Sequence, residues 1–327
     1  MINDAFIWNI KSKRYEVMKL ILKYYALISV LALSGVETME AQNKKATVRE
    51  VEKMLLTYSY SSPREYADFG RLYPYHRFDG YSSKGEMKAW KMIELENDYI
   101  KLWVAPDIGG KIWGAVDKKT GKEFLYYNHV VKFRDVSSRG PWTSGGLEMN
   151  FGIIGHAPWC SSAVDYKIKQ DDSGNALCII GGTDVSLGTD WRVQIILPAE
   201  SAYVETRVLW YNGTSSEKPF YQWMNAGIKT EGDLQYYFPG NTYLTHDGKA
   251  KPWPMEQGHR IDCYEENNFG HYKSYHVLGN NADFWGTYWH RDDFGLAHYS
   301  PKEDKLGKKI WIWGLSRYGM VWYGKIC

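Results

Sequence analysis

Glu148 and His156 are the side chains of this sequence whose types and surroundings best suit proton transfer. They lie in residues 140–158, GPWTSGGLEMNFGIIGHAP, which contain five glycines and two prolines. This density of glycine and proline opposes both a helix and a central strand, so it predicts a shaped loop leading into or out of a sheet. A carboxylate there can act as base or acid, and an imidazole can act as proton donor. The alternative is a tight turn with a solvated glutamate and a histidine bonded to backbone.

His290 is a third candidate for acid–base chemistry. It stands in TYWHRDD, with Asp292 and Asp293 close in sequence. A histidine with neighbouring carboxylates can hold or move a proton near neutral pH. A purely structural role is the alternative for His290, as it is for Glu148 and His156.

Five further side chains have the chemistry to bind a ligand that carries hydroxyl groups. Arginine and asparagine can hold hydroxyls through paired hydrogen bonds, and tryptophan offers a flat apolar face for stacking. The five are Arg77 and Asp79 in YHRFDGY, Trp142, and Trp223 and Asn225 in QWMNAG. The alternatives are a local salt bridge between Arg77 and Asp79 and core packing of Trp223.

The composition fits a saccharide ligand and argues against binding to nucleic acid or to a membrane surface. Aromatic residues make up 16% of the chain, including 15 Trp and 26 Tyr, and such rings suit a surface that stacks on sugars while its polar tips bind hydroxyls. The alternative is that a large β-protein uses these rings in its core. The net charge of +2 gives no sign of a nucleic-acid groove or a polybasic membrane patch.

Cofactor and metal motifs are missing from the sequence. It contains no GxxxxGK[ST] or GxGxxG nucleotide loop and no GxSxG elbow. Its four cysteines form no CxxC pair, so we expect no metal site of zinc-finger type. Because the nucleotide loops are also missing, we expect no cofactor. Asp and Asn are plentiful enough for a structural calcium, although no loop has the EF-hand pattern.

The N-terminal 42 residues are typical of a secretory leader. Residues 18–42 begin with Met18 and two lysines, continue with a mostly apolar run of about ten residues, and end in small and polar residues. We expect Met18 to be the true start, cleavage near Ala41, and a secreted or periplasmic protein with no stable membrane span after cleavage. The alternative is an N-terminal membrane anchor.

The remaining chain predicts a short helical lead-in followed by one β domain. Apolar residues recur at helical spacing in residues 43–60. From residue 61 to 327 short alternating runs flank hairpin turns such as residues 117–121 and 171–175, with no long helical period between them. This pattern predicts an all-β, large antiparallel sandwich with a short N-terminal helix.

An ordered set of motifs resembles a known family. It consists of YPYHRFDGY, LENDYIKLWVAPDIGGKIWGAVDKKTGKEFLYYN, GGLEMNFGIIGH, PFYQWMNAG and KIWIWGLSRYGMVW, in that order over about residues 70–322. The strand, APDIGGKI and the hairpin that ends in FLYYN look like the opening of galactose mutarotase-like proteins. The whole set resembles the DUF5107 family of secreted bacterial proteins, in which tetratricopeptide repeats often follow the sandwich.

The resemblance implies a galactose mutarotase-like β-supersandwich with a sugar-binding cleft, and a chain truncated before the repeats. The segment that resembles the histidine-bearing strand of aldose 1-epimerases reads Gln222-Trp223-Met224-Asn225 and carries no histidine. We expect a carbohydrate-active protein, either a glycoside hydrolase or a sugar epimerase. The alternatives are a non-catalytic carbohydrate-binding module of a glycan-utilisation system and a scaffold that has lost its partner-binding repeats.

Overall fold

The protein is an assembly of antiparallel β-sheets. The structure, a computed structural model, describes residues 45–59, 82–135, 141–151, 156–268, 273–279, 282–303 and 307–312. In these ranges the regular secondary structure is extended, apart from one 3₁₀ turn at Pro158–Ser161. No helix among the described residues is long and apolar enough to cross a membrane. The predicted all-β class is confirmed.

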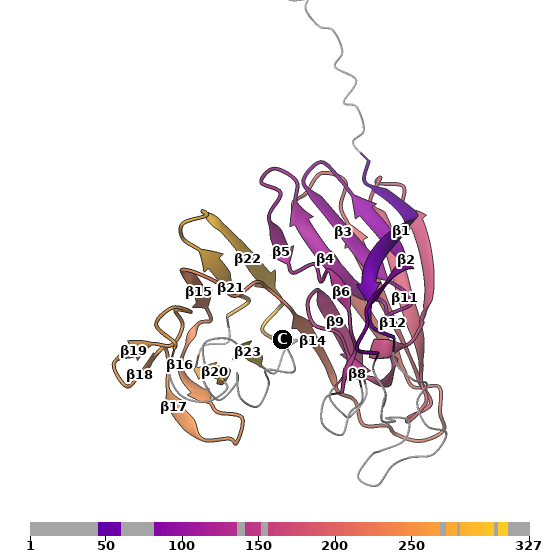
Figure 1. The fold of residues 1–327 in the computed structure, drawn as a ribbon. Coiled ribbons are helices and arrows are strands. Elements are labelled where there is room, and N and C mark those ends of the chain that lie inside the picture. Colours follow the sequence, from indigo (N-terminus) through magenta and orange to yellow (C-terminus); the bar gives the residue numbers. More distant parts are fainter. Residues whose placement is uncertain are drawn as a thin grey trace, which may run out of the picture. The chain divides into compact units, whose positions relative to one another are not determined.

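The largest sheet has eight strands and carries Glu148. Its order is β14-β9-β4-β3-β2-β1-β6, with β5 paired to β4 (Figure 1). All its pairings are antiparallel except that of β1 with β6. The strands are β1 (Thr47–Thr57), β2 (Glu86–Glu96), β3 (Ile100–Ala105), β4 (Lys111–Asp117), β5 (Glu123–Leu125), β6 (Val130–Val131), β9 (Leu147–Phe151) and β14 (Gln222–Ala226).

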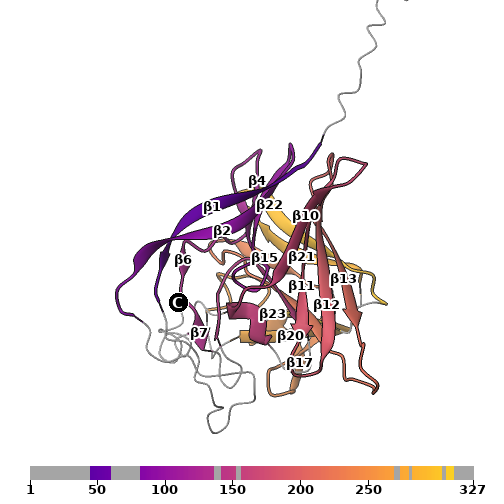
Figure 2. The same cartoon turned by 90° about the vertical axis from the view of Figure 1, so that its right-hand side faces the viewer.

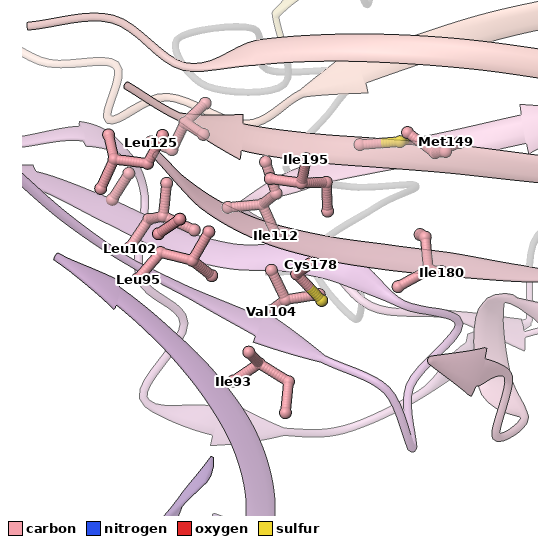
Figure 3. Close-up of a cluster of buried hydrophobic side chains, with 14 of the residues drawn as sticks. Ile93, Leu95, Leu102, Val104, Ile112, Leu125, Met149, Cys178, Ile180 and Ile195 are labelled. Atoms are coloured by element: carbon pink, nitrogen blue, oxygen red, sulfur yellow. The ribbon is translucent and has the colours of Figure 1, made fainter. Parts of the chain in front are cut away.

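A second sheet of four strands packs against the first and closes a sandwich. Its strands β10 (Asp165–Gln170), β11 (Ala176–Asp184), β12 (Thr189–Leu197) and β13 (Glu205–Tyr211) lie in sequence order, as Figure 2 shows. Alternate side chains of both sheets meet in one buried cluster, in which Leu95, Val104 and Ile112 face Cys178 and Ile195 (Figure 3). Burying a side chain of this size contributes about 1.5–3 kcal/mol.

The face of the eight-stranded sheet that points away from this core has its own buried cluster. Leu55, Trp90, Met92, Trp113 and Phe133 pack there. Successive side chains of a strand point to opposite faces, so β2 supplies Trp90 and Met92 to this face and Ile93 and Leu95 to the sandwich core. A sheet covered on both faces is a rigid support for a site.

The C-terminal part of the chain builds smaller sheets around a separate core. One has the order β15-β21-β22 and another the order β17-β16-β20-β23. Leu234, Tyr236, Tyr243, Trp253 and Trp289 are buried between them. The strands are β15 (Leu234–Tyr237), β16 (Gly240–Leu244), β17 (Ala250–Pro252), β20 (Lys273–Gly279), β21 (Phe284–Trp289), β22 (Phe294–Tyr299) and β23 (Lys308–Ile312), with two-stranded pairs β18 (Met255–Glu256)–β19 (His259–Arg260) and β7 (Arg134–Asp135)–β8 (Pro141–Trp142).

The helix predicted for residues 43–60 is wrong. Thr47–Thr57 is strand β1, and each of its residues pairs with a residue of β2, from Thr47 with Glu96 to Thr57 with Glu86. The apolar positions that recur at helical spacing also fit a strand, because Leu55 enters the outer cluster while Val48 packs on the sandwich core. Pairing with an 11-residue partner strand overrides the weak local preference.

The loop predicted for residues 140–158 is wrong at its centre. Leu147–Phe151 forms β9, an inner strand of the eight-stranded sheet, and Pro141–Trp142 forms the short β8. Glycine and proline lie on either side of LEMNF and not within it, so nothing in those five residues opposes a strand. Glu148 therefore projects from a sheet, where its position is fixed by pairing on both sides.

Candidate functional site

Strand pairing brings four polar or aromatic residues onto one face of the sheet. In β9, Glu148 and Asn150 are two residues apart and share a face. On the neighbouring β14, Asn225 lies opposite Glu148 and Trp223 opposite Asn150. Met149 and its partner Met224 point the other way into the sandwich core. The alternation of β9 and β14 thus separates core residues from candidate site residues.

Gly146 allows the chain to enter β9 close to β4. Its φ is 61°, and a Cβ at this position would overlap the carbonyl oxygen of Ile112. The Gly146 carbonyl accepts a hydrogen bond of 2.7 Å from the amide of Gly227, just beyond β14. Only glycine fits here, because a side chain would push β9 away from β4. This close approach sets the position from which Glu148 projects.

Glu148 uses one carboxylate oxygen and leaves the other unpaired. Its Oε1 accepts a hydrogen bond from Asn150 Nδ2 at 2.7 Å and lies 2.6 Å from His156 Nδ1. Its Oε2 is buried and has no hydrogen-bond partner among the described residues. The whole residue is only 3% exposed. Buried polar atoms without a partner are rare in proteins, and they often mark a place for water or a ligand.

The carboxylate of Glu148 is ionised at neutral pH. Burial acts to raise its pKa, but the hydrogen bond and charge of His156, the charge of Lys111 and the hydrogen bond from Asn150 outweigh it and hold the pKa below the ordinary value of 4.5. The surroundings therefore stabilise a negative charge in a buried place. Such a charge can accept hydrogen bonds from hydroxyl groups.

Lys111 is a buried cation on the neighbouring strand. Its Nζ donates to the carbonyl oxygen of Thr143 at 2.8 Å and lies 3.1 Å from the Thr143 hydroxyl oxygen. Burial lowers its pKa to about 8, although the charge of Glu148 acts in the opposite direction. Lys111 thus ties the segment before β9 to β4 and places a positive charge near Glu148.

His156 is held between two tryptophans. Its ring stacks on Trp142 with centroids 5.0 Å apart and planes at 15°, and it meets Trp223 in a T-shaped contact with centroids 5.2 Å apart and planes at 68°. The next amide, that of Ala157, donates to Asn150 Oδ1 at 2.7 Å, which ties this segment to β9. The indole Nε1 of Trp142 is buried without a hydrogen-bond partner among the described residues. An unpaired acceptor, Glu148 Oε2, and an unpaired donor thus occur in the same cluster.

The structure brings most of the predicted site residues together. Glu148, His156, Trp142 and Trp223 form one cluster, and Asn225 pairs with Glu148 across the strands. His290 belongs elsewhere: it follows β21, and its Nε2 contacts Gln235 Oε1 at 2.9 Å. The predicted ligand contacts Arg77 and Asp79 lie outside the described residues, as does the predicted leader at residues 1–42.

Sequence reasoning missed Lys111, Asn150 and Thr143. Asn150 follows Glu148 by two residues, which in a strand places both on one face, but this signal appears only once residues 147–151 are identified as a strand. Lys111 stands in the apolar run KIWGAV, where a charged residue is unusual. Its partner lies 32 residues along the chain, so the pairing depends on the fold.

The described residues contain no group of three or more His, Cys, Asp or Glu side chains arranged to hold a metal ion. Around Glu148 the described side chains supply one carboxylate, one imidazole, one amide, one ammonium group and the thiol of Cys160. That set suits proton exchange and hydroxyl binding.

Comparison with solved structures places the fold. A TPR-domain containing protein from Parabacteroides distasonis matches with a TM-score of 0.73 and 26% identity, over 83% of this chain and 47% of that one. The chain thus spans about half the length of that protein. The Slr1438 protein from Synechocystis matches with a TM-score of 0.45 and 14% identity, over 63% of this chain and 75% of its own. A galactose mutarotase-like protein from Clostridium acetobutylicum matches with a TM-score of 0.42 and 14% identity, over 61% of this chain and 74% of its own.

The family model described as "Domain of unknown function (DUF5107)" matches residues 67–326. This range contains the ordered motifs that pointed to the family, from YPYHRFDGY to KIWIWGLSRYGMVW, and also Glu148 and His156. The protein belongs to the DUF5107 family.

Proposed function

We propose that this protein binds a saccharide at the Glu148–His156 cluster and exchanges protons at its anomeric centre. The observation that carries the proposal is the buried Glu148 Oε2, which lacks a hydrogen-bond partner among the described residues although the carboxylate is ionised. A hydroxyl group of a ligand would supply the missing hydrogen bond. The tryptophans on either side of His156 offer faces for the C–H groups of a sugar ring. The resemblance of the motifs to galactose mutarotase-like proteins points to the same ligand class.

In the proposed reaction Glu148 is the base and His156 the acid. Glu148 Oε2 takes the proton of the anomeric hydroxyl, and the bond from the anomeric carbon to the ring oxygen breaks. His156, whose Nδ1 is engaged by Glu148 Oε1, gives a proton from Nε2 to the ring oxygen. The aldehyde group of the open-chain sugar then rotates. The reverse proton transfers close the ring to the other anomer and return Glu148 and His156 to their starting protonation states. Hydrolysis of a glycosidic bond usually needs a second carboxylate, whereas the groups that act on Glu148 within the described part of the chain are an imidazole, an amide, an ammonium group and the thiol of Cys160.

Saccharide binding without turnover is the second candidate function, and the pKa of Glu148 favours it. A general base works best when its pKa lies near the working pH. The neighbours of Glu148 hold its pKa below 4.5, which makes the carboxylate a good acceptor of hydrogen bonds but a weak base. A non-catalytic carbohydrate-binding module would use the same contacts to hold the sugar.

One experiment separates the two candidates. Wild-type protein, Glu148→Gln and the control Glu94→Gln would be screened against reducing mono- and oligosaccharides for a rise in melting temperature and for anomer exchange by NMR. Glu94 is a matched control because it is also buried in the eight-stranded sheet. Exchange that disappears only in Glu148→Gln supports the enzyme. A rise in melting temperature without exchange supports the binding module. Absence of both in the wild type contradicts both.

A further inference from the structure

The outer face of the β15–β21–β22 sheet is a second surface whose chemistry suits a ligand. Pairing sets Tyr237 beside Gly286 and Ala297, Phe284 beside Tyr299, and Gln235 beside Tyr288 and Gly295. The alternate residues Leu234, Tyr236, Trp289 and Phe294 point to the opposite side and pack in the C-terminal core. The aromatic face is defined here as Gln235, Tyr237, Phe284, Gly286, Tyr288, Gly295, Ala297 and Tyr299.

Aromatic rings on this face are exposed around a floor of small residues. Phe284 and Tyr299 are each 58% exposed and contact one another with ring centroids 4.8 Å apart. Tyr288 lies four residues beyond Phe284 on β21, about 13 Å along the strand. Gly286 and Ala297 occupy the space between them, and Tyr237, 48% exposed, borders it on β15. Rings around a flat floor leave room for a sugar ring to stack.

The polar groups at one end of the face present hydrogen-bond acceptors. His290 Nε2 lies 2.9 Å from Gln235 Oε1, and the Tyr237 hydroxyl donates to the same oxygen at 3.0 Å. Because that oxygen can only accept, His290 Nε2 carries a proton, and in that neutral tautomer Nδ1 can accept a hydrogen bond. Gln235 is itself held by Asp262, which binds Arg260 through both carboxylate oxygens. The acceptors are therefore fixed before a ligand arrives.

The aromatic face contains no charged side chain among its eight residues. A ligand that complements it is neutral, donates hydrogen bonds to His290 and Tyr237, and offers apolar C–H faces to the rings. Saccharides combine these properties, and the carboxylate of Asp293, which accepts a hydrogen bond from the Tyr288 hydroxyl at the edge of the face, would accept sugar hydroxyls but repel a nucleic acid or an acidic peptide. We propose that the aromatic face is a second saccharide-binding surface, separate from the Glu148 cluster, which holds a neutral polysaccharide.

The full chain would be run in native gels with and without a soluble β-glucan, a xylan or a galactomannan. We expect at least one of these to retard the wild type. Phe284→Ala with Tyr299→Ala, and separately Tyr237→Ala, should each weaken binding roughly tenfold, because each removes an exposed stacking ring. Tyr211→Ala is the matched control, since Tyr211 is equally exposed on β13 of the other sheet and should leave retardation unchanged.

Two results would overturn the inference. One is a wild type that no polysaccharide retards, or variants retarded as strongly as wild type. The other is dimerisation of the wild type that the same substitutions abolish, because the face would then join two copies of the chain. The Phe284→Ala, Tyr299→Ala double variant should keep any anomer exchange that the wild type shows, so a failure of this surface and a failure of the Glu148 cluster are distinguishable.

Discussion

Glu94 and Glu148 are both buried in the eight-stranded sheet, but their surroundings differ. Glu94 Oε1 accepts from Arg49 Nη2 at 2.6 Å, and Glu94 Oε2 accepts from Trp103 Nε1 at 2.9 Å, with Lys101 Nζ 3.8 Å away. Within the described ranges, Glu148 has hydrogen-bond partners on Oε1, and Oε2 has none. Burial acts to raise both pKa values, yet their partners hold both below the ordinary value.

The difference separates a carboxylate that stabilises the fold from one that we propose to bind a ligand. A glutamate that stabilises the fold gains most when both oxygens are hydrogen-bonded, because an unpaired buried oxygen costs free energy. Glu94 meets that condition through side chains of β1 and β3. Glu148 has a histidine, an amide and a nearby lysine, and still keeps Oε2 unpaired. The proposal that Glu148 binds a ligand rests on this difference.

The largest effect is expected for His156, which has no counterpart beside Glu94. Replacing His156 with Gln removes the proposed acid and should lower kcat/KM for anomer exchange by about 10²–10⁴-fold. The melting temperature should also fall, because Gln can still donate to Glu148 Oε1 but lacks the ring that stacks on Trp142 and the charge that stabilises the buried carboxylate. Kinetics on any sugar found in the screen would measure this. An unchanged rate would mean that the ring only packs between Trp142 and Trp223.

Glu94→Ala should reduce stability while leaving activity intact. The substitution leaves the Trp103 indole N–H without its partner, which should cost about 1–3 kcal/mol in the free energy of unfolding. Urea denaturation would measure it, with Glu52→Ala on the exposed side of β1 as the control. Loss of anomer exchange without loss of stability would contradict the structural role of Glu94.

The smallest expected effect is that of Lys111 on the pH dependence of the free energy of unfolding. The sign of this effect follows from the burial of the Lys111 side chain. Its pKa in the fold is about 8, below the ordinary ~10.4 of an unfolded chain, so the unfolded state binds more protons between these values and stability rises with pH there. The wild type should gain about 1.5 kcal/mol between pH 8 and 9.5 relative to Lys111→Met. Lys273, whose pKa burial also lowers to about 8, contributes equally to both proteins. If the free energy of unfolding changed with pH in the same way in the wild type and in Lys111→Met, Lys111 would not be buried as a cation.

Hairpins were the part of the fold that local sequence could predict. Turn residues in DKKTG and DDSGN lie between β4 and β5 and between β10 and β11, because Asp and Gly favour those backbone angles wherever the strands end up. The strand at Thr47–Thr57 could not be predicted locally, because its partner β2 begins 29 residues after its end. Helical spacing of apolar residues is weak evidence when a long partner strand is available.

The candidate site was accessible to sequence reasoning only in part. Glu148, His156 and Trp142 lie within 15 consecutive residues, so their short separation in the sequence was enough to predict that they lie close together. Trp223 and Asn225 joined them through the register of β14 on β9. The position of His290 depends on the β15–β21 pairing, which placed it beside Gln235 instead. Lys111 required knowledge of which loop covers the start of β4.

The most direct test of the central claim is a crystal structure of the protein with a bound saccharide from the screen. A sugar hydroxyl within about 3 Å of Glu148 Oε2, with the ring against Trp142 or Trp223, is the predicted result. A saccharide bound elsewhere while Oε2 is hydrogen-bonded to the chain itself would contradict the claim, because Glu148 would then be a structural carboxylate like Glu94.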